Sequence, residues 1–97
     1  MSSQSPPLDA QGAGFNGQIP PVEALLAEVI ATLSLAAHAY LAESGDEGSG
    51  LQAAEIAIDV ASAAFERVKE RLTPEERLAT AQMLTETRMA FIRKRGL

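Results

Sequence analysis

The chain contains no cysteine and no tryptophan, and aromatic residues make up only 4% of its 97 positions. The absence of thiols excludes a disulfide framework and any zinc site built from cysteine. The only histidine is His38, and the residue three positions before it is Leu35, so the chain lacks the Glu-x-x-His motif of metal-binding bundles. One histidine on an alanine-rich segment also gives no basis for a Ser-His-acid set. We therefore expect no catalytic residues, no metal, no cofactor and no enzymatic activity.

Basic residues are missing from the first two thirds of the sequence. No lysine or arginine precedes Arg67, whereas nine acidic residues do, and the formal net charge of the chain is −5. A nucleic-acid-binding protein normally needs a basic face, so we expect no nucleic-acid partner. The uneven distribution predicts that acids of the first part pair with bases of the second.

Residues 24–42 form the longest apolar stretch, with Glu28 and His38 as its only ionisable side chains. Its length is close to that of a membrane span. The early glutamate, the lack of a basic flank and the use of alanine rather than leucine argue against insertion. The N-terminus shows no positive region followed by an apolar one, so we expect no signal peptide. We predict a cytoplasmic protein whose first helix is buried in a bundle, with a membrane anchor through residues 21–43 as the alternative.

The order of polar and apolar segments predicts three helices. Residues 1–19 are rich in Ser, Gln, Gly and Pro and are expected to be a disordered tail, and residues 44–50 a glycine-rich loop. A helical domain should span residues 20–95, with helices at about 21–43, 51–72 and 74–94. Apolar residues spaced by threes and fours define a buried seam on each of the first two helices. These seams are Val22, Leu26, Val29, Leu33, Ala36 and Tyr40, and Leu51, Ala54, Ile58, Ala61, Phe65, Val68 and Leu72. Short connections then give an all-α, antiparallel three-helix bundle running up, down and up.

The third helix begins with a recognisable start signal. Thr73 is followed by Pro74 and, three residues later, by Glu76, which predicts a capping box with proline in the first turn. Glu75 and Glu76 also suit the positive end of a helix dipole. We expect these carboxylates to cap the helix rather than to act as a catalytic pair.

If the chain turns back at residues 72–74, oppositely charged residues of the second and third helices should face each other in two pairs. Asp59 should lie opposite Arg88, and Glu70 opposite Arg77. We predict both as structural ion pairs, that of Asp59 and Arg88 at the edge of the helix interface. The alternative role of Arg88 is to hold a small anion or another ligand.

The first two helices carry a second apolar side in addition to their seams. A helix that is apolar all round is buried all round or shared with another chain. We therefore predict that this side completes the bundle by self-association, with a dimer favoured and an unidentified protein partner as the alternative. The predicted self-association face comprises Ala24, Ala27, Ala31, Leu35, His38, Ile56, Val60 and Ala63.

Residues 51–92 carry a set of motifs in a fixed order. Leu51-x-x-Ala54-x-x-x-Ile58-Asp59 is followed by Leu72-Thr73-x-Glu75-Glu76 and then by Arg88-Met89-x-Phe91. This arrangement resembles the small all-helical bacterial proteins of domain-of-unknown-function family 1844. The chain differs from that family's pattern in residues 67–71, ahead of the Leu-Thr element. The resemblance implies an uncharacterised bacterial protein and no assigned activity.

These observations favour a non-enzymatic helical module for protein–protein interaction or assembly. The alternatives are a small membrane-associated protein and a helical bundle that binds a small anion through Arg88.

Overall fold

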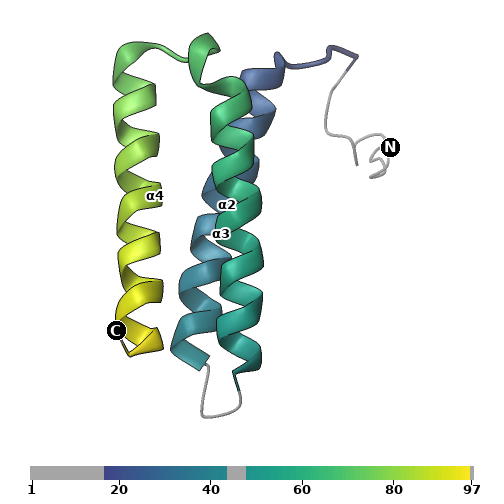
Figure 1. The fold of residues 1–97 in the computed structure, drawn as a ribbon. Helices are drawn as coiled ribbons and strands as arrows, with labels where there is room; N and C mark the ends of the chain where they lie inside the picture. Colours follow the sequence, from purple (N-terminus) through teal and green to yellow (C-terminus); the bar gives the residue numbers. More distant parts are fainter. Residues whose placement is uncertain (1–16, 44–47, 97) are drawn as a thin grey trace, which may run out of the picture.

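The protein folds as an all-α bundle. The computed structural model describes residues 17–43 and 48–96, and these contain α2 (Val22–Glu43), α3 (Ser49–Val68), the short 3₁₀ turn η1 (Lys69–Arg71) and α4 (Pro74–Arg95). Each helix runs antiparallel to the one before it, and α4 lies along the α2/α3 pair (Figure 1). The described residues include no strand. The predicted three-helix antiparallel architecture is therefore confirmed.

Helix α3 buries the side that its sequence periodicity predicts. Every residue of its predicted seam is buried or half-buried. Ile58, near the middle of this seam, is 1% exposed and packs with Ala37 and Leu41 of α2 and with Phe91 of α4. A second cluster, toward the other end of the helix pair, joins Ile30 of α2 to seam residues of α3 and to Leu84 of α4.

Helix α2 buries a different side from the predicted one. Its fully buried residues are Ile30, Ser34, Ala37 and Leu41, which lie about a quarter turn from the predicted seam at 100° per residue. Of the predicted seam, Leu26 and Leu33 pack against the core, but Val22, Val29 and Tyr40 are exposed. This prediction was wrong because α2 contacts both α3 and α4, so its buried stripe lies between the side that faces α3 and the side that faces α4. On a helix that is apolar all round, the spacing of apolar residues does not indicate which side faces the core.

Both ends of α4 follow local sequence signals. The Thr73 hydroxyl accepts a hydrogen bond from the Glu76 backbone N–H at 3.1 Å, and the Glu76 carboxylate accepts one from the Thr73 backbone N–H at 2.9 Å. This is the predicted capping box, with Pro74 as the first helical residue. At the other end Gly96 has a φ of 91°, a left-handed conformation that glycine adopts without steric cost.

The connections differ from the predictions in two places. Ser49 and Gly50 belong to α3 rather than to a loop, because Gly48 adopts a φ of 84° and lets the chain turn directly into the helix. Helix α3 ends at Val68 rather than at residue 72, and η1 and an extended Leu72 complete the turn. Residues 1–16 of the predicted tail and residues 44–47 of the predicted loop lie outside the described residues. Residues 17–19 are exposed and form no helix.

Candidate interaction surface

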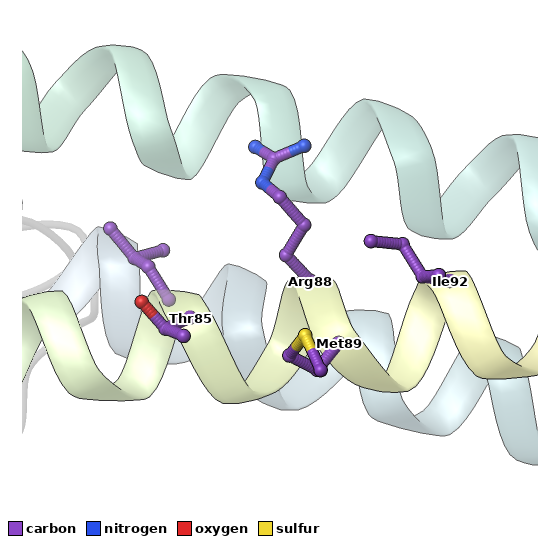
Figure 2. A pocket seen from close by; sticks show the side chains of 5 residues that line it. Thr85, Arg88, Met89 and Ile92 are labelled. Carbon is purple, nitrogen blue, oxygen red and sulfur yellow. The ribbon is translucent and has the colours of Figure 1, made fainter.

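Arg88 crosses from α4 to α3. Its guanidinium Nη2 donates a hydrogen bond to the Ser62 hydroxyl at 3.0 Å and lies 3.9 Å from a carboxylate oxygen of Asp59. Figure 2 shows the side chain extending from α4 toward α3, while Thr85 and Met89 remain close to the α4 ribbon. Residues Leu84, Thr85, Arg88, Met89 and Ile92 line a shallow, mostly apolar hollow of about 180 Å³ beside it.

The contact between Arg88 and Asp59 is weaker than a bidentate arginine–carboxylate pair. Both side chains are about half exposed or more, and one long contact replaces two parallel hydrogen bonds. Exposed ion pairs of this kind contribute about 0–1 kcal/mol to stability. The antiparallel register brings Arg88 and Asp59 together as predicted. The shorter contact of Arg88, however, is with the hydroxyl of Ser62, which lies about one turn from Asp59.

The predicted pair between Glu70 and Arg77 is wrong. Arg77 Nη2 instead donates to the Leu72 carbonyl at 3.4 Å, and the part of the chain that the structure describes contains no Glu70–Arg77 ion pair. The reason is the 3₁₀ turn, which places Glu70 outside the regular α3 register on which the prediction depended.

An ion pair that the sequence analysis missed joins the start of α2 to η1. Arg71 Nε donates to a carboxylate oxygen of Glu23 at 3.0 Å. A hydrogen bond from the backbone N–H of Glu23, and next the bond from Arg71, hold the pKa of the Glu23 carboxyl below its ordinary value. The sequence contained the information for this contact. In an antiparallel helix pair, an acidic residue at the start of the first helix lies close to a basic residue just after the end of the second helix.

His38 contacts α4 instead of pointing away from the bundle. Its Nε2 lies 3.2 Å from the hydroxyl of Thr87, a residue that is 1% exposed. The Thr87 hydroxyl donates its own hydrogen to the Met83 carbonyl, so Nε2–H of His38 is the donor in this contact. His38, which was predicted to lie on the self-association face, is exposed but lies at the edge between α2 and α4.

Within the described ranges, no group of three or more His, Asp and Glu side chains is arranged to hold a metal ion.

An exposed apolar area lies on the side of α2 and α3 that faces away from α4. Around each helix at 100° per residue, Val29 lies about 180° from His38, and Val60 lies about 160° from Ser62. Because His38 and Ser62 both contact α4, Val29 and Val60 point away from it. We call this side the outer face. Five of the nine large apolar side chains that are exposed among the described residues belong to it: Val22, Val29, Tyr40, Ile56 and Val60.

The outer face overlaps the predicted self-association face but is not identical to it. Ile56 and Val60 are common to both, and they are 64% and 49% exposed. Ala63 is exposed as well and lies about 60° from Val60 around α3. The α2 part of the prediction does not belong to the outer face, because Ala24, Ala27, Ala31 and Leu35 lie within about 60° of His38, which contacts α4. The residues that the prediction missed are Val22, Val29 and Tyr40, because it assigned them to the buried seam.

Helix α2 also has the length and composition of a membrane-crossing helix, and 22% of its most apolar stretch is buried inside the bundle. A core helix of a soluble protein can have the same composition, but would be mostly buried. Thirteen of the 22 residues of α2 are exposed, and nine of these are apolar.

Comparison with known proteins gives no matching family model, no matching curated protein and no matching solved structure. The resemblance of residues 51–92 to domain-of-unknown-function family 1844 therefore stays a prediction.

Proposed function

We propose that this protein is a non-enzymatic, cytoplasmic assembly module that self-associates through the outer face. The observation that carries the proposal is the grouping of five large exposed apolar side chains on one side of α2 and α3. Apolar groups of this size cost free energy in contact with water, at about 25 cal/mol for each Å². A second protein surface that covers them removes this cost.

The size of the face agrees with a protein–protein contact. Two adjacent helices of 22 and 20 residues are each about 30 Å long, and together they present a strip about 20 Å wide. Roughly 600 Å² of each subunit would be covered, or about 1,200 Å² in total, which is the lower end of the range for stable complexes. Small side chains such as Ala36, Ala39 and Ala53 let two such layers approach closely.

The test is the mass of the full chain in solution, measured by light scattering coupled to size exclusion over a series of protein concentrations. We expect a mass near twice the 10.2 kDa of the chain. The variant Ile56→Asp places a charge in the outer face and should be monomeric. The matched control is Leu78→Asp, because Leu78 is 61% exposed but lies on α4, and it should remain dimeric.

A monomer at every concentration would contradict the proposal. Equal behaviour of the two variants would contradict the assignment of the interface to the outer face.

The second candidate function is association with a membrane through α2, which the exposure of this apolar helix favours. Insertion would require α2 to leave its contacts with α3 and α4. Sedimentation with neutral lipid vesicles separates the two functions, because only the membrane candidate predicts that the wild-type chain is found with the vesicles.

A further inference from the structure

We infer that two copies of this chain pair through their outer faces in an antiparallel arrangement, in which Glu43 of each subunit meets the partner's Arg67. This inference rests on the proposed function and specifies how the subunits are oriented. It depends on charges at the two ends of the outer face.

Glu43 and Arg67 both point to the outer face. Glu43 lies about 40° from Val29 around α2, and Arg67 lies about 20° from Val60 around α3, at 100° per residue. Both side chains are exposed. The ion pairs found in the bundle use neither residue.

The two residues lie at opposite ends of the face. Glu43 is the last residue of α2, next to the start of α3. Arg67 lies one turn before Arg71, which contacts Glu23 at the beginning of α2. At 1.5 Å per residue the separation along the helices is roughly 27 Å, so Glu43 and Arg67 cannot pair within one chain.

Symmetry leaves two ways for the outer face to pair with a copy of itself. A two-fold axis along the helices places each residue level with the same residue of the other subunit. Glu43 would then be level with the partner's Glu43, and Arg67 with the partner's Arg67. A two-fold axis across the helices, near the middle of α2, reverses the partner and brings Glu43 level with the partner's Arg67 at both ends of the interface.

Charge decides between these arrangements. The parallel one sets like charges against each other at both ends, whereas the antiparallel one forms two complementary pairs.

The test reverses one charge at a time. The variants Glu43→Arg and Arg67→Glu each replace both intersubunit pairs by like charges, so each alone should weaken the dimer by about tenfold or more. Mixed together, the two variants form a heterodimer in which both pairs are complementary again. We therefore expect the 1:1 mixture to regain the dimer mass, measured by light scattering and by native mass spectrometry.

Two controls keep the test specific. Glu86→Arg reverses an exposed charge on α4 and should leave the dimer unchanged, and circular dichroism should show the same helix content in all variants.

The outcomes separate the orientation from the proposed function. A wild-type dimer that survives both reversals, or two monomeric variants whose mixture stays monomeric, would overturn the antiparallel pairing and leave self-association standing. A monomeric wild-type chain would remove both.

Discussion

Helices α2 and α3 are neighbours of nearly equal length, yet their sequences identify their buried sides to very different degrees. In α3, Glu55, Asp59 and Glu66 lie together on one flank of the predicted seam and mark one edge of the buried stripe. In α2, nearly every position is apolar, and the stripe that is buried includes Ser34 while Val29 and Tyr40 stay exposed. Polar residues, more than apolar ones, thus indicate which side of a helix faces the core.

The largest effect is expected for a comparison of two isoleucines of α3 that lie two residues apart. Ile58 is 1% exposed and Ile56 is 64% exposed. We expect Ile58→Ala to lower the free energy of unfolding by about 2–5 kcal/mol, because it leaves a cavity in the core. Ile56→Ala should change it by about 0.5 kcal/mol or less.

The measurement is urea unfolding followed by circular dichroism, at a protein concentration too low for association. Equal losses for the two variants would mean that the buried side of α3 is misplaced.

A substitution with a smaller expected effect tests which side of α2 is buried. The Ser34 hydroxyl is buried and, within the described residues, has no hydrogen-bond partner. A buried polar group without a partner destabilises the fold, so Ser34→Ala should raise the free energy of unfolding by about 1 kcal/mol. The control Thr32→Ala changes an exposed residue of the same helix and should have an effect of only a few tenths of a kcal/mol.

Thermal or urea unfolding of both variants provides the comparison. A clear loss of stability in Ser34→Ala would show that the hydroxyl is satisfied and that α2 is packed differently.

The smallest effect concerns the ion pair that joins α2 to η1. The pKa of the Glu23 carboxyl is lowered by the bond from its own backbone N–H and then by that from Arg71, so Arg71→Ala should raise this pKa part of the way toward its ordinary value. Because the pKa is depressed in the folded state, the stabilisation from ionised Glu23 is present above the pKa of the unfolded chain. It is lost as the pH falls through the lower, folded value.

Side-chain carboxyl shifts in an NMR titration follow Glu23 directly. Lys69→Ala, which removes the exposed pair with Glu66, should leave the Glu23 titration unchanged. A Glu23 pKa that is the same in the wild type and in Arg71→Ala would mean that the Arg71 contact is not maintained in solution.

Local signals in the sequence predicted more of this structure than long-range ones did. The capping box at Thr73 depends on a few consecutive residues, and it was predicted correctly. The approach of Arg88 to Asp59 depended only on the antiparallel register, which the short turn fixes. The pair between Glu70 and Arg77 required the α-helix to continue through residue 72, and the change to a 3₁₀ turn has no clear signal in the sequence.

The candidate interaction surface was predictable in part for the same reason. Ile56 and Val60 oppose a well-defined buried stripe on α3, so their exposure follows from that stripe. The contribution of Val29 and Tyr40 depends on where α4 lies against α2, which is a tertiary contact that the pattern of α2 alone does not determine.

The junction before α4 has a consequence for how the helices stay aligned. Leu72 is anchored in the core, and the next residue, Thr73, already caps α4. No linker residues separate the buried Leu72 from the start of α4, so α4 cannot shift along its axis relative to α2 and α3. This short connection fixes the register of α4 against α3 and so places Arg88 beside Ser62.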